Sequence, residues 1–502
     1  MDRNSALKVP AAAPIVERAP GWALLLTGAI AMVLVGKRWN VGALAWVMPV
    51  PFLLYLWTRK GWRPKLALLG VVQVAMVLQV YKLVTAPMPA VIAVAYGVPL
   101  GLAAWIVYVA WDLLRRKVGD RAALYAYPAL VALVEVLIYR LTEVGTWGSG
   151  AMTQLENLPL LQLASLFGSS AIGFVVAWTA SLGALLLATR ERRRYLPDAV
   201  VLALALVAVF AFGSFRLFSD QGRTVNVAGI MTDLGPGPGG LPDAAAISRN
   251  NEELFQRSAT AADRGARLVA WNEGATVVGT AGEKDFVDRG TRFARERGVD
   301  LVLAYIVPVS TAPRQFRNKY VWIGEDGKVL ETYEKHHPVP GEGSLRGTAP
   351  LLAMERPFGR SAGAICYDYD FPAMAVAHGR LGVGLVVLPA SDWKGIDPYH
   401  SQNARIRAIE GGFNVLRPTR WSTSVAFDAY GRLRAELPAF ETNERILIAT
   451  LPTQHVPTLY SQIGDSVALV YAAYLLSLAL RAVLKGRERG KARAPACKDA
   501  RA

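Results

Sequence analysis

The sequence predicts a polytopic α-helical membrane domain of about eight transmembrane helices, joined to one large α/β domain. Three observations lead to this prediction. The chain is 53% hydrophobic and only 19% charged, whereas soluble domains carry about 25% charged residues. Its apolar residues gather in eight long runs, and most of these approach the roughly 20 residues that span a bilayer. Residues 215–460 hold no such run and instead alternate strand and helix patterns.

The apolar runs set the order of the parts. They cover residues 21–36, 41–58, 66–86, 90–114, 122–142, 161–189, 196–214 and 464–484. The first two are short and are separated by the polar residues 37–40, and we interpret them as two spans rather than one re-entrant pair. We therefore expect a cytoplasmic tail at 1–20, seven transmembrane helices at 21–214, an α/β domain at 215–460, a last transmembrane helix at 461–484 and a basic cytoplasmic tail at 485–502.

The positive charge of the chain indicates its orientation. Of the 55 lysines and arginines, 23 lie in five short segments at 1–20, 59–65, 115–121, 190–194 and 481–502. With eight spans, all five segments fall on one side of the membrane, and such basic loops mark the cytoplasmic side. The α/β domain then lies outside the cytoplasm. The rest of the chain is close to neutral although the net charge is +16, which argues against nucleic-acid binding.

The α/β domain alternates strands and helices along its length. Strand patterns appear in RTVNVAGI, ARLVAWNEG, LVLAYIVP, SAGAIC, VGLVVLPAS, NVLRP, TSVAFDAYGRLRAEL and RILIATLP. KYVWIGEDG and KVLETYEK predict a hairpin that turns at Gly324–Gly327. Helical patterns cover 244–264, 284–297, 370–380 and 397–412. This alternation favours a layered α/β domain in which helices cover buried sheets.

Three strand ends carry residues that could be reactive. Glu273 follows LVAWN, Lys335 follows KVLETYE and Cys366 follows SAGAI. A cysteine becomes a useful nucleophile when a base takes its proton and a cation stabilises the developing charge. Taken singly, a cysteine is as often a small core residue, and a Glu or Lys at a strand end is more often solvated. However, Cys497 is the only other cysteine and lies across the predicted bilayer, so Cys366 has no disulfide partner and is a candidate reactive thiol.

The motifs around these residues resemble those of a known superfamily. In chain order, WNEGA, YEKHHPVPGEG and ICYDYDF resemble the Glu, Lys and Cys motifs of the nitrilase, or carbon-nitrogen hydrolase, superfamily. The helix frame resembles its membrane-embedded branch, the apolipoprotein N-acyltransferases. So do ENLPLLQLASLFG at 156–168, SDWKGIDPYHSQNARIRAIEGGFNVLRPT at 391–419 and LYSQIGD at 459–465. The resemblance implies a nitrilase-like αββα sandwich for residues 215–460.

Some features depart from the family pattern. Only 30 residues separate Lys335 from Cys366, which is a shortened segment for the family. Asp368 stands where the family has Glu, Asn272 stands where it has Pro, and VPGE lacks the family's aromatic residue. None of these departures removes the Glu-Lys-Cys set.

The resemblance implies a role for each member of this set. Cys366 would attack a phospholipid acyl ester, and Glu273 would act as the general base. Lys335 and the amide N–H of Tyr367 would hold the oxyanion, and Glu342 would support the lysine. The α-amine of a lipoprotein's diacylglyceryl-cysteine would then take the acyl chain from the thioester in a ping-pong cycle.

Candidate substrate contacts lie near these residues. Trp393 resembles an aromatic residue close to the nucleophile and would touch an acyl chain, with a plain core role equally open. Residues 338–362 form a Pro- and Gly-rich candidate rim for a cleft that opens to the membrane. In it, Pro350, Leu351, Leu352 and Met354 would face lipid, and Arg346 would meet a headgroup phosphate. The alternative is an ordinary surface loop that packs on its own domain.

The resemblance also implies a setting in the cell. The protein would be a monomer in the bacterial inner membrane, with a phospholipid acyl donor, a lipoprotein acceptor and no nucleic-acid partner. We expect no cofactor, and no metal because the histidines, cysteines and carboxylates lack ligand spacing. Two other hypotheses stay open: a membrane-tethered carbon-nitrogen hydrolase, or amidase, and a non-catalytic membrane scaffold.

Overall fold

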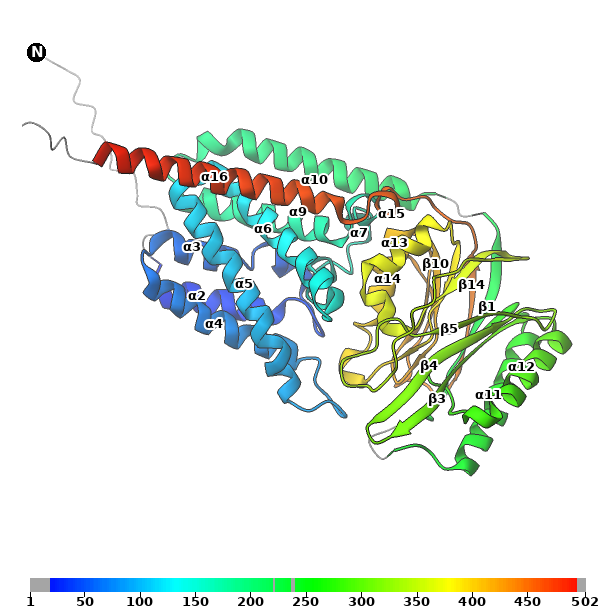
Figure 1. Ribbon diagram of the computed structural model, residues 1–502. Coiled ribbons are helices and arrows are strands. Elements are labelled where there is room, and N and C mark those ends of the chain that lie inside the picture. The colour runs from blue at the N-terminus through cyan, green and yellow to red at the C-terminus, as the bar shows by residue number, and fades with distance from the viewer. Residues whose placement is uncertain (1–18, 220–221, 236–239, 494–502) are drawn as a thin grey trace, which may run out of the picture.

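A computed structural model describes residues 19–219, 222–235 and 240–493. It shows a helical part and an α/β part that lie side by side (Figure 1). Most of the predicted tail at 1–20 lies outside the described residues, as do residues 494–502 of the tail predicted at 485–502. The last helix continues to Arg493, so the described part of the basic tail extends that helix.

The helical part contains nine α-helices before the α/β domain and two after it, within the described residues. The first group is α2 (Gly21–Leu34), α3 (Val50–Thr58), α4 (Trp62–Tyr81), α5 (Val91–Val118), α6 (Asp120–Leu141), α7 (Leu158–Leu161), α8 (Ala164–Phe167), α9 (Ser169–Ala188) and α10 (Leu196–Leu217). The second is α15 (Leu459–Ile463) and α16 (Val467–Arg493). Short 3-10 turns are η1 (Gly42–Trp46), η2 (Gly145–Gly148), η3 (Gly150–Thr153), η4 (Arg192–Tyr195) and η8 (Gly464–Ser466).

Six of these helical stretches are long and apolar enough to cross a membrane, within the described part of the chain. They are Trp62–Tyr81, Val91–Val118, Asp120–Leu141, Ser169–Ala188, Arg192–Leu217 and Leu459–Glu488. Their outer faces expose large apolar side chains such as Leu204, Val207 and Leu476, each at least 64% exposed. Contiguous exposed apolar surface of this kind suits contact with lipid. The predicted membrane domain is confirmed.

The first two apolar runs differ from the remaining runs. They form the helix α2, of 14 residues, and the interrupted stretch Gly42–Thr58. At 1.5 Å per residue, 14 residues reach about 21 Å, short of the roughly 30 Å hydrocarbon core. The second run breaks between η1 and α3, where Pro49 precedes the first turn of α3 and Pro51 lies in it, because proline is favoured at a helix start and disrupts an interior.

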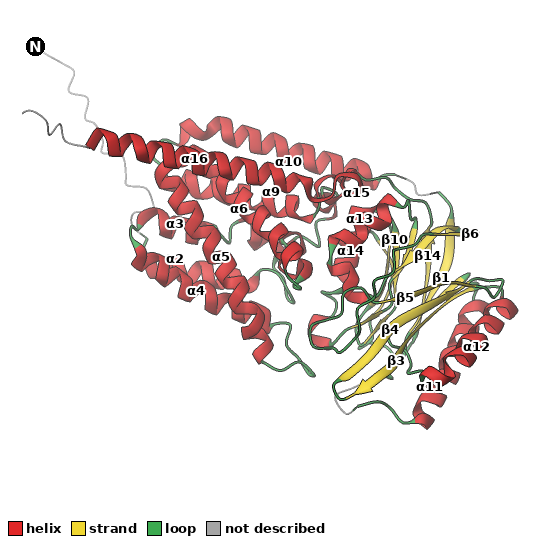
Figure 2. Cartoon of the chain, in the orientation of Figure 1, coloured by secondary structure: helices red, strands yellow, loops and turns green. Residues whose placement is uncertain are grey.

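The α/β domain is a sandwich of two six-stranded sheets with helices on both outer faces (Figure 2). The first sheet has the order β14-β1-β2-β3-β4-β5 and the second β13-β12-β10-β8-β7-β6. The first holds β1 (Thr224–Ile230), β2 (Leu268–Trp271), β3 (Asp300–Thr311), β4 (Arg314–Ile323), β5 (Val329–Glu334) and β14 (Ile446–Pro452). The second holds β6 (Met354–Arg356), β7 (Gly359–Gly363), β8 (Leu385–Val387), β10 (Asn414–Arg417), β12 (Ser424–Phe427) and β13 (Leu433–Leu437). A separate pair joins β9 (Ala390–Ser391) to β11 (Thr419–Arg420).

The helices complete four layers. Helices α11 (Ala244–Asp263) and α12 (Glu283–Arg297) cover the first sheet, and Leu254, Phe255 and Ala294 pack on it. Helices α13 (Pro372–Arg380) and α14 (Ser401–Gly411) cover the second sheet, on the side of the membrane helices (Figure 1). A buried apolar cluster lies between the two sheets and includes side chains of both. The predicted αββα sandwich is confirmed.

Two predicted helices begin later than the sequence pattern suggested. Residues Cys366–Asp370 form a 3-10 turn, η6, so α13 begins at Pro372 rather than at 370. Helix α14 begins at Ser401 rather than at 397, because Pro398 disfavours helical geometry in the preceding Asp397. Both differences leave polar residues in loops beside the strand ends.

Polar contacts join the α/β domain to the membrane helices. The Ser169 N–H at the start of α9 donates to Glu410 on α14 at 2.9 Å, and Gln162 Nε2 donates to the Tyr430 carbonyl at 2.8 Å. The Trp147 indole N–H donates to Asp370 Oδ2 at 2.6 Å. These contacts are buried or half-buried, so they fix one part against the other.

Candidate active site

The ends of three strands bring three predicted residues to one region of the sandwich. Strand β2 runs parallel to its neighbours β1 and β3, and β7 runs parallel to β8. Glu273 follows β2, Lys335 follows β5 and Cys366 follows β7. Their exposed fractions are 5%, 1% and 4%. The Glu273 N–H donates to the Ala390 carbonyl at 3.3 Å, and this bond ties the end of β2 to β9 in the separate β9–β11 pair.

Lys335 lies between two carboxylates. Its Nζ is 2.8 Å from Glu273 Oε1 and 3.0 Å from Glu342 Oε2. Asn318 Nδ2 also donates to Glu273 Oε1, at 2.7 Å. The Lys335 backbone N–H donates to the Asn318 carbonyl at 2.9 Å, so strand β4 holds both ends of this arrangement.

Burial and charge act against each other on these groups. Burial by itself lowers the pKa of Lys335, but the charges of Glu273 and Glu342 outweigh burial and hold that pKa well above its usual value. Burial raises the pKa of Glu342; Lys335 opposes this rise and Glu273 adds to it. The two carboxylates therefore favour the protonated, cationic form of Lys335.

Cys366 is a neutral thiol at rest. Burial, followed by the charge of Glu273, raises its pKa well above the usual value, and Lys335 only partly offsets this. The thiol therefore needs a base before it can react, since the thiolate is the nucleophile. Its Sγ lies 3.8 Å from the Ser391 carbonyl and 4.0 Å from Asp392 Oδ1.

The backbone at Cys366 is strained. Its φ is +47°, in the left-handed region that side chains other than glycine rarely adopt. Strain of this kind is held in place by surrounding contacts and gathers at functional sites. Here the Cys366 N–H donates to the Pro389 carbonyl at 2.9 Å. The next residue, Tyr367, is the second residue of the 3-10 turn η6, and the first N–H groups of such a turn have no partner within it.

Asp368 holds this turn against the lysine loop. It accepts hydrogen bonds from the backbone N–H groups of Ile365 and His337, at 2.9 and 2.7 Å. It also accepts one from the Tyr333 hydroxyl at 2.8 Å. The shorter carboxylate, noted above as a departure from the family pattern, is thus fully bonded and buried.

A charged cluster that the sequence analysis missed lies next to the thiol. His400 Nδ1 is 2.7 Å from Asp392 Oδ1, and its Nε2 is 3.1 Å from Asp370. Arg417 donates to Asp392 from two nitrogens, at 3.1 and 3.2 Å. Asn403 donates to Asp370 at 2.7 Å. The signal available in the sequence was Asp392, which directly follows the strand pattern VGLVVLPAS.

Three of these groups have the spacing of a metal site. Ligand atoms of Cys366, Asp392 and His400 lie within 4.8 Å of one another. However, Arg417 Nη2 donates to Asp392 and lies 3.0 Å from His400 Nδ1. A guanidinium in this position repels a metal cation, so the donor set fits an ion-pair network better than a metal site.

We predict that His400 makes stability depend on pH. Burial lowers its pKa, but Asp370 and Asp392 outweigh burial and raise it to about 9, from about 6.5 in the unfolded chain. The stabilisation is fully present below pH about 6.5 and is lost as the pH rises through about 9; its size is on the order of 3 kcal/mol. The unfolding difference between wild type and His400→Gln should be largest at pH 6 and shrink by pH 9.5, measured by thermal unfolding in detergent.

The matched control for this prediction is His455→Gln. Burial lowers the pKa of His455, so its removal should not give a difference that shrinks with rising pH. A His400→Gln difference that is constant between pH 6 and pH 9.5 would show that the imidazole is neutral in the folded protein.

A mostly apolar cavity of about 260 Å³ lies between the membrane helices and this region. Its walls include Met88, Ile92, Tyr96 and Leu100 from α5 and the loop before it. Its walls also include Val339, Pro340, Gly341, Glu342, Tyr367 and Trp393. The cavity therefore reaches both the residue after Cys366 and the carboxylate bonded to Lys335.

Only some of the predicted substrate contacts lie at this cavity. Trp393 lines the cavity, and its indole N–H donates to the Leu83 carbonyl at 2.8 Å. Arg346 is half-exposed and lies 3.2 Å from Glu143, just beyond the end of α6. Leu351 and Met354 instead pack against the core of the α/β domain, because β6 pairs with β7 and turns this segment inward. Leu352 remains 48% exposed.

Comparisons with known proteins agree with both parts of the chain. Residues 237–459 match the carbon-nitrogen hydrolase family, and residues 28–182 match the apolipoprotein N-acyltransferase N-terminal domain. The apolipoprotein N-acyltransferase of Bradyrhizobium diazoefficiens is 30% identical over 377 residues, which cover 67% of this chain and 69% of that protein. The one from Shewanella oneidensis is 26% identical over 389 residues, 70% of this chain and 72% of that protein. An amidase structure from Nesterenkonia sp. aligns with a TM-score of 0.40 and 21% identity, over 51% of this chain and 98% of that one.

Fold and site together define a membrane-embedded enzyme of the carbon-nitrogen hydrolase superfamily. Within this class, the match of residues 28–182 to the N-terminal domain and the 30% identity to the Bradyrhizobium diazoefficiens protein indicate one family. The chain belongs to the apolipoprotein N-acyltransferase family.

Proposed function

We propose that this protein moves an acyl chain from a phospholipid, through a thioester on Cys366, to the N-terminal amine of a lipoprotein. The observation that carries the proposal is the apolar cavity of about 260 Å³ between the membrane helices and the α/β domain. It places Glu342 and Tyr367 in the wall of a space that suits a hydrocarbon chain. A hydrolase of small soluble amides needs no such space.

The first half-reaction forms the thioester. Glu273 takes the proton of the Cys366 thiol as the sulfur attacks the ester carbonyl of the phospholipid. Lys335 and the Tyr367 N–H stabilise the oxyanion of the tetrahedral intermediate. The C–O bond to the glycerol then breaks, and the leaving oxygen takes the proton from Glu273, which releases a lysophospholipid. Lys335 suits this role because it is held as a cation.

The second half-reaction transfers the chain. The α-amine of a diacylglyceryl-cysteine attacks the thioester carbonyl, and the same donors stabilise the second oxyanion. Glu273 takes a proton from the amine and passes it to the departing Cys366 sulfur. An amide forms, the thiol is regenerated, and the cycle is of the ping-pong type. Arg346 is the proposed contact for a headgroup phosphate, since it lies beside the end of α6.

We propose that the protein lies in the inner membrane as a monomer, with the α/β domain on the extracytoplasmic side. The basic segments between the apolar runs support this orientation. We retain the predicted boundaries of the parts, with the catalytic domain at 215–460 and the last span at 461–484.

A donor and acceptor assay tests the function. Purified protein is incubated with a phospholipid that carries a labelled acyl chain and with a diacylated lipopeptide that has a free N-terminal cysteine amine. We expect labelled triacylated lipopeptide and an equal amount of lysophospholipid. Release of labelled free fatty acid without lipopeptide acylation would favour a hydrolase, and no consumption of either substrate would favour a non-catalytic scaffold.

We predict that filling the cavity shortens the acyl chain that the enzyme accepts. In Leu100→Trp, the larger side chain should occupy space needed by a long chain, and overpacking of about 1–3 kcal/mol corresponds to a roughly 5- to 150-fold loss. Transfer from a 16-carbon donor should fall by this factor, whereas transfer from an 8-carbon donor should stay near wild type.

Leu102→Trp is the matched control for this prediction, because Leu102 lies two residues away on the same helix and is 42% exposed. It should leave the chain-length profile unchanged. Equal losses for both donors in Leu100→Trp would place the acyl chain elsewhere.

A further inference from the structure

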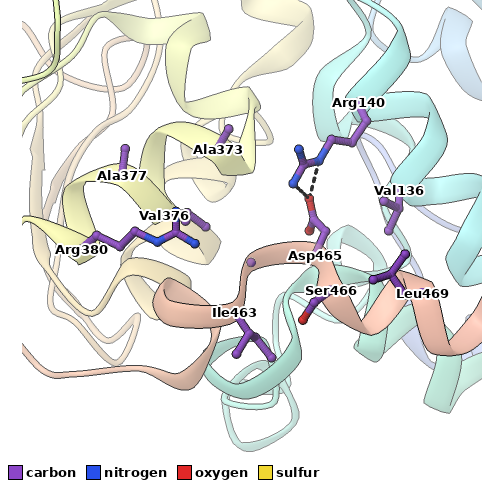
Figure 3. A pocket seen from close by; sticks show the side chains of 11 residues that line it. Val136, Arg140, Ala373, Val376, Ala377, Arg380, Ile463, Asp465, Ser466 and Leu469 are labelled. Atoms are coloured by element: carbon purple, nitrogen blue, oxygen red, sulfur yellow. Dashed lines mark hydrogen bonds and ion pairs between the residues drawn. The ribbon is translucent and has the colours of Figure 1, made fainter.

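A second cavity lies on the opposite face of α13 from the sheet, where this helix meets two membrane helices (Figure 3). Its volume is about 470 Å³. Its walls come from α6, α13 and the junction of α15 with α16: Val136, Arg140, Ala373, Val376, Ala377, Arg380, Ile463, Gly464, Asp465, Ser466 and Leu469. None of the proposed catalytic residues lines it, so it is a separate space.

Asp465 in this cavity has no capacity left for a ligand. Its Oδ1 accepts hydrogen bonds from the hydroxyls of Tyr139 and Tyr460, at 2.7 and 2.6 Å. Its Oδ2 accepts from two nitrogens of Arg140, both at 2.6 Å. A carboxylate offers about four lone-pair sites, and all four are used. Asp465 therefore cannot also bind an ammonium group.

The two arginines retain free donors. Arg380 Nε and Nη2 donate to the carbonyls of Ser461 and Gln462, both at 2.9 Å. Among the described residues, Arg380 Nη1 and Arg140 Nη1 have no acceptor. Figure 3 shows Arg380 reaching from α13 toward the Arg140–Asp465 pair, with Ser466 on the same side as Asp465. The cavity thus presents donors and, with Arg140, Arg380 and Asp465, a net charge of one positive unit.

Apolar residues of the cavity wall lie about one helical turn away from Arg140 and Asp465. Val136 precedes Arg140 by four residues on α6, and Leu469 follows Asp465 by four residues, on α16. Four residues of α-helix correspond to about 6 Å along the axis. Leu469 is 72% exposed. Both helices run from this level into the membrane, so a charged layer lies above an apolar one, as phosphate lies above acyl chains in a bilayer leaflet.

We propose that this cavity binds the phosphate diester of an anionic bilayer phospholipid, with its acyl chains against Leu469. The guanidinium groups of Arg380 and Arg140 hold the phosphate in charge-assisted hydrogen bonds. A single negative charge neutralises the single positive charge of the cavity. A zwitterionic headgroup brings an ammonium for which the saturated Asp465 offers no acceptor, so phosphatidylglycerol binds more tightly than phosphatidylethanolamine.

Native mass spectrometry of the full-length protein in a maltoside detergent tests this site. Phosphatidylglycerol is titrated in, and the first binding step is compared between variants. Loss of a charge-assisted hydrogen bond should weaken this step about tenfold or more in Arg380→Gln. Arg380→Lys should retain most of the binding. Arg360→Gln is the matched control, because Arg360 is an arginine on the α/β domain that is 46% exposed and lies outside the cavity.

Further arms distinguish the sources of phosphate. Ala373→Trp fills the cavity from an exposed position and leaves both arginines in place, so it should weaken binding as Arg380→Gln does. Glycerol 3-phosphate should bind at least tenfold more weakly than phosphatidylglycerol, and phosphatidylethanolamine should compete poorly. Equal phosphatidylglycerol binding by Ala373→Trp, Arg380→Gln and wild type would overturn the proposal. Equally tight binding of glycerol 3-phosphate would instead identify a site for soluble phosphate esters, and equally tight phosphatidylethanolamine would refute the anionic preference.

Discussion

Replacement of Cys366 by serine should reduce acyl transfer at least about 1,000-fold, since loss of a catalytic nucleophile removes the covalent route. A buried alcohol is a far weaker nucleophile than a thiol, and the same base cannot ionise it to a useful extent. The measurement is the initial rate of lipopeptide acylation, with acyl-enzyme formation followed on a gel with a fluorescent donor. Neither signal should exceed background in the variant.

The control is Cys366→Ala. The thiol donates only weak, long hydrogen bonds, to the Ser391 carbonyl at 3.8 Å and to Asp392 Oδ1 at 4.0 Å, so the alanine variant should keep the melting temperature of wild type within a few degrees. A serine variant with near-normal activity would make Cys366 a structural residue and remove the thioester mechanism.

Replacement of Lys335 by methionine should affect both activity and stability. Loss of one oxyanion donor costs about 100-fold or more in rate. Removal of the cation also leaves buried Glu273 and half-buried Glu342 without their shared positive charge, and breaking a buried ion pair in this way costs about 3–5 kcal/mol. The two effects are measured separately, as the rate of acyl-enzyme formation and as thermal unfolding in detergent.

A second substitution separates the two effects. In Lys335→Met with Glu342→Gln, one of the two buried charges is gone, so most of the lost stability should return while activity stays low. Glu273→Gln alone should keep its contact with Lys335 through the amide oxygen and still fail to form acyl-enzyme, because an amide cannot take the thiol proton. Wild-type rates of acyl-enzyme formation in Glu273→Gln and in Lys335→Met would contradict the proposed roles.

The sequence predicted the strands and turns that a local pattern of apolar residues and glycines defines. The strands that precede Glu273 and Cys366 are short apolar runs, and the hairpin before Lys335 alternates around a glycine turn, so each strand end could be located from the sequence. Reactive residues tend to lie at such strand ends, and the resemblance of the three surrounding motifs to one superfamily grouped Glu273, Lys335 and Cys366. Their roles stay predictions.

The contacts that the sequence did not predict are those made between distant segments. His400 directly precedes α14, Arg417 ends β10 and Asp370 ends η6, and the packing of α14 on the second sheet brings them to Asp392. Leu351 looked like a lipid-facing residue because it is apolar and follows prolines and glycines, but strand pairing of the next residues turns it toward the core. The local sequence pattern does not indicate the residues that contact Asp392 or the core side chains that contact Leu351.

The resting state of Cys366 has a consequence for the survival of the enzyme. Oxidants attack the thiolate far faster than the thiol, and each step beyond sulfenic acid is hard to reverse. On the extracytoplasmic side, where we place this domain, thiols are normally consumed in disulfides. Because burial raises the pKa of Cys366 well above its usual value, the unoccupied enzyme presents almost no thiolate. Its single catalytic sulfur would therefore outlast exposure to an oxidising compartment and become vulnerable mainly during turnover, when a base removes its proton.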